Sequence, residues 1–147
     1  MSDIATIWVP TAAHGDWAVD DGQLVTGQDL ETAVLISLFS DGLAAADDVI
    51  TDGSGDRRGW WADTGSAKPV GSRLWLLDRS KQTAQVLAAA HDYIAEALQW
   101  LIDDGVVAEV SVATEWTRPG LLGARVLLLR QDGAVLALNY SWAWSSV

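Results

Sequence analysis

The chain has 147 residues and a formal net charge of −11, from 20 acidic and 9 basic side chains. This length suits one domain that can bury a core without the help of disulfides or metal ions. The absence of cysteine excludes disulfides and thiolate metal sites. So acidic a surface repels phosphate backbones, so nucleic acid is not an expected partner. Hydrophobic residues make up 50% of the chain and 9 residues are tryptophan, which excludes an acidic disordered tail.

The N-terminal region predicts no targeting segment and one β-hairpin. It lacks a basic segment followed by an apolar run, and no apolar stretch in the chain reaches the ~20 residues of a membrane span. We therefore expect neither a signal peptide nor a membrane partner. The apolar run 4–9 stops at Pro10. Residues 16–19 and 23–25 flank Asp20-Asp21-Gly22, and Asp-Gly between such runs predicts a hairpin within residues 1–27.

Residues 28–40 have helical spacing. An acidic first turn begins at Asp29, and apolar or small residues recur on one side, which predicts about three turns of helix. Residues 41–71 then collect glycine, aspartate and proline. This loop is longer than the ~12 to 15 residues above which structureless loops become uncommon in compact domains, and loops that long usually carry function or contacts.

Residues 72–104 predict two helices. In the first, over 72–77, Ser72 supplies the cap oxygen and Trp75 belongs to the core. The second runs from about Gln82 to Asp103 and ends at Gly105. Its apolar stripe predicts the covering layer of the core, and consists of Leu87, Ala90, Ile94, Ala97, Leu98 and Leu101.

Residues 106–144 change to a period of two, which predicts a three-stranded antiparallel meander. The first strand is expected to bury Val106, Ala108, Val110, Val112 and Trp116. Two further strands, 124–130 and 134–144, flank the turn 131–133. The last is expected to present one face to the long helix, with Leu136, Leu138, Tyr140, Trp142 and Trp144 on it. The predicted fold class is α+β, as a single domain over 1–147.

The sequence offers little catalytic chemistry. His14 and His91 lie far apart and are read as solvated or locally satisfied. Glu109 and Glu115 on one strand face are about 20 Å apart, too far for a glycosidase pair. A loop rich in aspartate lacks the ligand series of a calcium site and is read as solvated; its carboxylates are Asp47, Asp48, Asp52 and Asp56. We predict no catalytic residue, no cofactor and no metal ion.

The strongest candidates are recognition residues, because tryptophan and arginine carry much of the energy of buried contacts. Residues 56–63 hold two arginines and two adjacent tryptophans. Either these indoles fold back as a lid on the core while the arginines pair with neighbouring aspartates, or the cluster anchors a partner. The turn 116–120 presents another indole and guanidinium at a strand end. The candidate partner-binding residues are Arg57, Arg58, Trp60, Trp61, Arg73, Trp116 and Arg118.

Several of these motifs together resemble a known family. Asp-Arg-Arg-Gly-Trp-Trp at 56–61, Gly-Ser-Arg-Leu-Trp-Leu-Leu at 71–77, Lys-Gln-Thr at 81–83 and Asn-Tyr-Ser-Trp at 139–142 resemble the Mu-like gene product 46 family of phages and prophages. Residues 30–34 and 97–101 fit it too. The resemblance spans nearly the whole chain, and the combination of motifs in this order is specific.

The resemblance implies a non-enzymatic structural protein of a contractile-tail baseplate, similar to small wedge proteins of the gene-product-25-like type. It implies contacts with other wedge and hub proteins, and with tail tube or sheath proteins as further candidates. The expected location is the virion tail baseplate, after assembly in the bacterial host cytoplasm. Those wedge proteins often carry Glu-Pro-Arg before the meander, whereas residues 115–119 only scatter these residue types.

Two other functions stay open from the residues alone. A small cell-wall glycan hydrolase associated with phage infection needs two carboxylates that converge in a cleft. An acidic adaptor needs only a basic partner bound by charge. Salt separates the adaptor from a tryptophan-anchored protein, because purely electrostatic contacts are screened.

Overall fold

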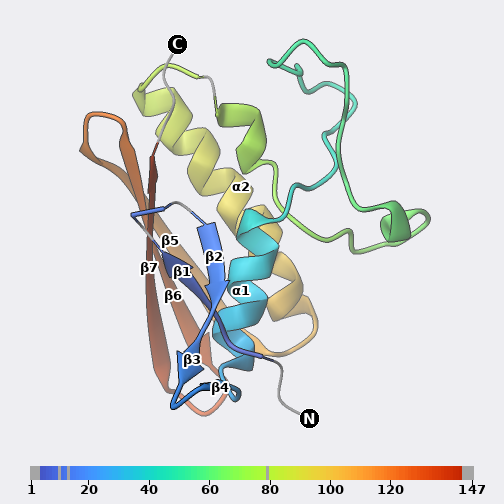
Figure 1. Ribbon diagram of the computed structural model, residues 1–147. Coiled ribbons are helices and arrows are strands. Elements are labelled where there is room, and N and C mark those ends of the chain that lie inside the picture. The colour runs from blue at the N-terminus through green and yellow to red at the C-terminus, as the bar shows by residue number, and fades with distance from the viewer. Residues whose placement is uncertain (1–3, 10, 13, 79, 144–147) are drawn as a thin grey trace.

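The computed structural model describes residues 4–9, 11–12, 14–78 and 80–143, without the side chains of 142 and 143. Figure 1 shows helices packed beside a strongly twisted sheet, with the N-terminal strands below and a long loop to one side. The elements in chain order are β1 (Thr6–Val9), β2 (His14–Trp17), β3 (Val19–Asp20), β4 (Gln23–Leu24), α1 (Asp29–Phe39), η1 (Trp61–Asp63), η2 (Leu74–Leu77), α2 (Ala84–Asp103), β5 (Val107–Arg118), β6 (Leu121–Arg130) and β7 (Val135–Ala143).

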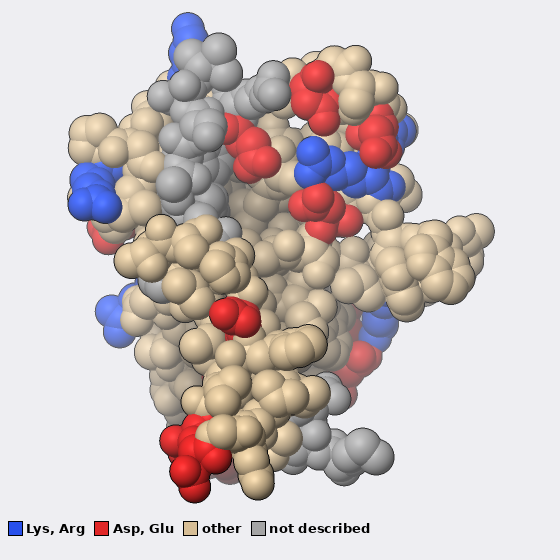
Figure 2. Space-filling model, viewed as in Figure 1, with Lys and Arg blue, Asp and Glu red and all other residues tan. Residues whose placement is uncertain are grey.

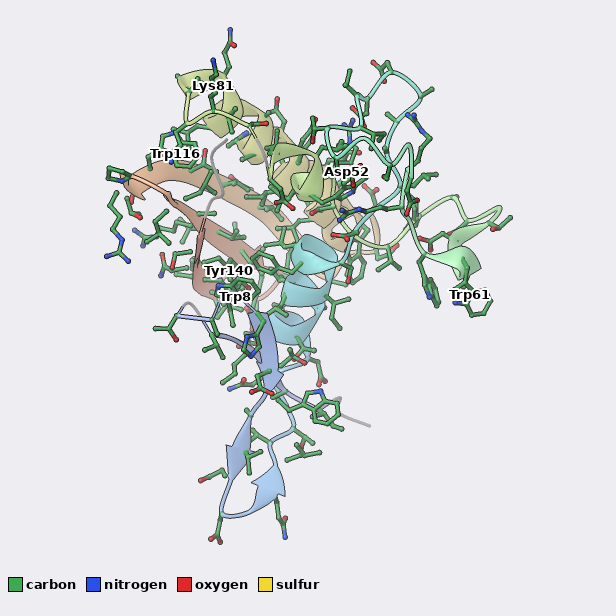
Figure 3. The ribbon with its side chains drawn as sticks, turned by 45° about the horizontal axis from the view of Figure 1, so that its top comes forward. Trp8, Asp52, Trp61, Lys81, Trp116 and Tyr140 are labelled. Atoms are coloured by element: carbon green, nitrogen blue, oxygen red, sulfur yellow. The ribbon has the colours of Figure 1, made fainter. Side chains whose placement is uncertain are left out.

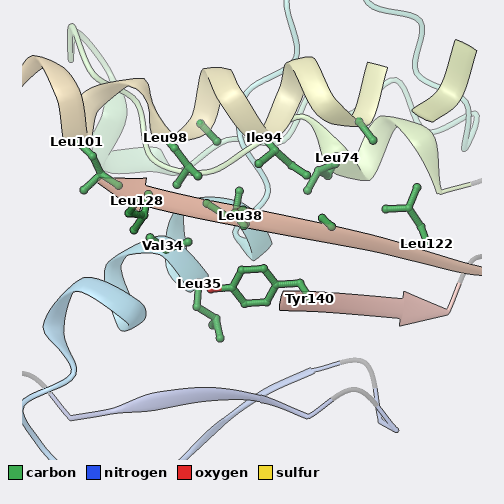
Figure 4. Close-up of a cluster of buried hydrophobic side chains, with 14 of the residues drawn as sticks. Val34, Leu35, Leu38, Leu74, Ile94, Leu98, Leu101, Leu122, Leu128 and Tyr140 are labelled. Atoms are coloured by element: carbon green, nitrogen blue, oxygen red, sulfur yellow. The ribbon is translucent and has the colours of Figure 1, made fainter. Parts of the chain in front are cut away.

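The C-terminal sheet is antiparallel with the strand order β5-β6-β7, so the predicted meander and the α+β class are confirmed. Its central strand buries alternate residues, Leu122, Val126 and Leu128, which have no exposed surface. The apolar stripe of α2 packs against them, and Ile94 and Leu98 are equally buried (Figure 4). Burying each such side chain contributes about 2 kcal/mol, so this layer is the main source of stability.

The strands β1 and β2 pair antiparallel and form the N-terminal hairpin, which together with α1 covers the β7 side of the sheet. Trp8 of β1 stacks on Phe39 of α1 with 3.9 Å between ring centroids, and Phe39 meets Tyr140 edge-on at 5.5 Å. The Trp8 indole N–H donates to the Ser141 carbonyl at 2.7 Å. Burial raises the pKa of Tyr140 above its ordinary value. The long helix was predicted to cover this strand; it shares that role with α1, and the side chains of Trp142 and Trp144 lie outside the described residues.

The start of β5 departs from the prediction. Val106, expected to be buried, is 44% exposed, whereas Val107 is fully buried. A register shift between Val107 and Glu109 explains this, because a bulge adds one residue to β5 and reverses the alternation on its N-terminal side. The prediction that Val106 and Ala108 share a face with Val110 was therefore wrong.

Element ends follow local sequence signals closely. Thr83 caps α2 by accepting a hydrogen bond from the Val86 amide, so the helix begins two residues later than predicted. Gly105 ends it at φ +72°. The predicted Asp-Gly hairpin is confirmed: β3 pairs with β4, and Asp21 and Gly22 both have positive φ, as a type I′ turn requires. Neither described helix is long and apolar enough to span a membrane.

A candidate interaction surface in the central loop

The central loop, residues 41–71, is closed at its base by its own backbone. Gly42 N–H donates to the Ser72 carbonyl at 2.8 Å, and Ser72 N–H donates to the Ser40 carbonyl at 2.9 Å. The buried Ser72 hydroxyl donates to the Leu38 carbonyl at 2.5 Å and accepts from Leu74 N–H at 3.3 Å. Ser72 thus ties the loop to α1 as well as to η2, although Arg73 occupies the cap position of η2.

Gly71 makes this closure possible, and replacing it tests the closure. Its φ is +100°, and a Cβ there would lie 2.6 Å from the Ser40 carbonyl oxygen. Gly71→Ala should therefore lower the free energy of unfolding by at least about 2 kcal/mol in urea titrations. Gly65→Ala is the matched control, because Gly65 also has a positive φ of +81° but no atom lies near its Cβ position. Equal losses of stability in both variants would show that the loss comes from backbone strain alone and not from the close approach to Ser40.

The first half of the loop, residues 41–58, is clamped onto the body by Arg58. Its guanidinium lies 4.3 Å from the centroid of the Trp75 ring and donates to Asp41 at 2.6 Å, with Asp52 at 3.6 Å. Trp75 is buried, as predicted, and its indole N–H donates to the Gly42 carbonyl at 2.8 Å. Burial alone would lower the pKa of Arg58, but the bond and charge of Asp41 outweigh burial and raise it. Arg58 therefore stays charged and orders the loop.

Arg73 makes a second clamp between the loop and α2. One guanidinium nitrogen donates to both oxygens of Asp48, at 3.1 and 3.0 Å, and another donates to Glu96 at 2.7 Å. The guanidinium also lies 4.6 Å from the centroid of the Tyr93 ring. These contacts use Arg73 within the chain, where the sequence suggested it as a partner-binding residue.

Asp48 is the exception to the prediction of a solvated acidic loop. Its side chain is only 13% exposed. Burial alone would raise the pKa of Asp48, but the Arg73 hydrogen bond, the Ala45 amide and the charges of Arg73 and Arg57 outweigh burial and lower it. By contrast Asp47, Asp52 and Asp56 are exposed. The prediction was wrong for Asp48 because its partner lies 25 residues away, where no local pattern reveals it.

The second half of the loop, which we name the tryptophan arm (residues 59–70), projects away from the body. Trp60 is 53% exposed and Trp61 is 82% exposed, with ring centroids 5.8 Å apart. The indoles therefore do not fold back as a lid. Figure 3 shows Trp61 at the far end of the arm, and the outer part of the same protrusion is tan in Figure 2.

The arm is held in shape by its own hydrogen bonds. The Asp63 carboxylate accepts from Val70 N–H at 2.9 Å and so joins the two sides of the arm. The Thr64 hydroxyl donates to the Trp61 carbonyl at 3.0 Å. Lys68 pairs with Asp104 beyond the end of α2. An exposed pair of indoles on a preformed loop loses less entropy on binding than a flexible segment would.

The remaining candidates are dispersed. Arg57 is half-buried at the loop, and one of its guanidinium nitrogens is buried with no hydrogen-bond partner among the residues that the structure describes. Trp116 lies at the other end of the molecule, where its indole donates to the Thr83 carbonyl at 3.3 Å (Figure 3). Arg118 is exposed at the end of β5. The structure therefore brings Arg57, Arg58, Trp60, Trp61 and Arg73 into one loop region and leaves the other two far from it.

Residues 30–135 match the family model described as phage protein GP46. Over its full 147 residues, the chain is 42% identical to the baseplate protein gp46 of Escherichia phage Mu, whose whole length is covered. It is 34% identical over 146 residues to the Mu-like prophage FluMu protein gp46 of Haemophilus influenzae, with 99% of each chain covered. This agreement with the resemblance in the sequence motifs shows that the chain belongs to the phage protein GP46 family.

Proposed function

We propose that this protein is a structural component of a phage or prophage tail baseplate, and that its tryptophan arm docks it to a neighbouring wedge or hub protein. The relative from phage Mu is named as a baseplate protein, and the match covers both chains entirely. The role is structural rather than catalytic, and the protein's place is the virion tail, after assembly in the host cytoplasm. The comparisons give no support to a glycan hydrolase.

The main support for docking through the arm is the exposure of two adjacent tryptophans on a projecting loop whose base is fixed. Large exposed aromatic surface is costly to leave in water, and tryptophan is the residue most enriched at interface hot spots. Arg58 and Arg73 hold the base of the loop, so they position the arm. We assign the contact itself to Trp60 and Trp61, which enter a pocket on the partner.

Co-expression tests this proposal. The chain is produced with the neighbouring baseplate reading frames, captured through an affinity tag, and washed at low and at high salt. A tryptophan-anchored contact should retain a wedge or hub protein at high salt, because burial of apolar surface is not screened. If every partner leaves at high salt, an acidic adaptor bound by charge is the better description. A solitary protein that clears peptidoglycan would instead establish the hydrolase.

The shape of the arm supplies a second prediction. Asp63→Ala removes the carboxylate that accepts from Val70 N–H, so the arm should become more flexible while both indoles remain. We expect partner capture to weaken about three- to tenfold, because the arm must then be ordered on binding. Asp132→Ala, which removes a comparable turn contact to Ala134 N–H, is the control and should leave capture unchanged. Unchanged capture in both variants would show that the partner does not need a preformed arm.

A further inference from the structure

A second surface lies on the body of the protein, apart from the tip of the tryptophan arm. A pocket of about 400 Å³ opens between the N-terminal hairpin and η2. Its walls include three aromatic side chains, and three titratable groups border it; these six residues are Trp8, Phe39, Trp75, His14, Asp41 and Asp78. Its volume falls within the range of small-ligand sites.

The charge in this pocket is unbalanced. Asp41 is paired with Arg58, but in the part of the chain that the structure describes no cation forms an ion pair with Asp78. Burial and the nearby negative charge of Asp41 raise the pKa of Asp78, and the charge of Arg58 offsets this only in part. His14 is exposed and lies 4.0 Å from Asp16, which is also exposed. Among the described residues, the pocket therefore offers a carboxylate without an ion-pair partner beside aromatic rings.

Within this protein, an aromatic ring beside a carboxylate already binds a guanidinium group at two places. Arg58 places its guanidinium over the Trp75 ring and donates to Asp41 at the border of the same pocket. Arg73 repeats the arrangement elsewhere, over Tyr93 and between two carboxylates. A planar guanidinium satisfies both requirements at once, because it stacks on an indole and donates to carboxylates in its own plane.

We propose that this pocket accepts one arginine side chain from a partner protein, with the guanidinium between the aromatic walls and the Asp78 carboxylate. The contact is independent of the tryptophan arm, so the protein would hold its neighbours at two separate surfaces. The charge complementarity fits a chain of net charge −11, whose partners are expected to present basic side chains.

Titration of the intact chain with N-acetyl-arginine amide tests the pocket. The readouts are the indole N–H signals of Trp8 and Trp75, whose hydrogen bonds to Ser141 and Gly42 give them fixed environments. Both signals should move in a saturable way, and Asp78→Asn should weaken binding about tenfold. N-acetyl-citrulline amide, which has the same shape without the charge, should leave them unmoved.

Three results would overturn the proposal: no saturable movement, equal binding by Asp78→Asn, or equal binding of the citrulline probe. The exposed Trp61 indole in the same spectrum reports unspecific stacking and should change only in proportion to the added probe. Asp104→Asn, which removes a surface carboxylate near the arm, is the control variant and should bind as the natural chain does. None of these outcomes depends on the arm, so failure here leaves the baseplate docking proposal to its own test.

Discussion

Trp61→Ala should reduce capture of the baseplate partner by at least about tenfold, because truncating a hot-spot tryptophan commonly costs 2 kcal/mol or more. Trp60→Ala should act in the same direction. The melting temperature should change by about 1 °C or less, since substitutions at exposed positions away from the core are close to neutral. Capture is measured from co-expressed baseplate proteins, and stability by thermal unfolding of the isolated chain.

Trp17→Ala separates a specific contact from general stickiness. Trp17 is 62% exposed on β2, between the exposures of Trp60 and Trp61, but it lies outside the arm. Its loss should leave capture within about twofold of the natural protein, as expected for a neutral surface position. Equal loss of capture from Trp17→Ala would contradict docking through the arm. If Trp60→Ala and Trp61→Ala lowered the melting temperature in parallel with the loss of capture, the two tryptophans would act in folding and not in docking.

Much of the fold can be predicted from the sequence because local patterns determine it. The stripe on α2, the cap at Thr83, the stop at Gly105 and the Asp-Gly turn each act within a few residues. The bulge after Val107 is different, since a single extra residue reverses the exposed face and carries no distinct pattern in a run of small apolar residues. Periodicity alone therefore places the strand correctly and its first residues wrongly.

The sequence reveals the residue types of the candidate site but not how their side chains are arranged. The arginines and tryptophans of residues 57–61 stand out by residue type, yet only the structure separates their roles. Arg58 turns inward because Asp41 and Trp75 lie beside it, whereas Trp60 and Trp61 turn outward on a loop fastened at Asp63. These contacts join residues 7 to 25 positions apart through an irregular loop, where no repeating pattern specifies which side chains meet. The sequence thus names the recognition residues without showing which of them face a partner.

Arg73→Gln should lower the free energy of unfolding by about 3 kcal/mol, because it leaves the largely buried Asp48 carboxylate without the cation that it pairs with. For a domain of this size the melting temperature should fall by roughly 10 °C. Arg73→Lys should recover only part of the loss, since one ammonium group cannot reproduce the fork between Asp48 and Glu96. Lys68→Gln, which removes the exposed pair with Asp104, is the control and should cost less than about 1 kcal/mol.

The pH dependence of the stability difference between the natural chain and Arg73→Gln tests whether the loss comes from the ion pair with Asp48. Because the pKa of Asp48 is lower in the folded protein than its ordinary 3.8, its contribution is fully present above 3.8 and disappears as the pH falls through the folded value. The stability difference between the natural chain and Arg73→Gln should therefore be constant near neutral pH and shrink in acid below 3.8. A difference that persists unchanged in acid would assign the effect to packing on Tyr93. If Arg73→Gln lost partner capture at a temperature where it is fully folded, Arg73 would act in docking as well as in folding, either by positioning the arm or by contacting the partner as its place among the sequence candidates suggests.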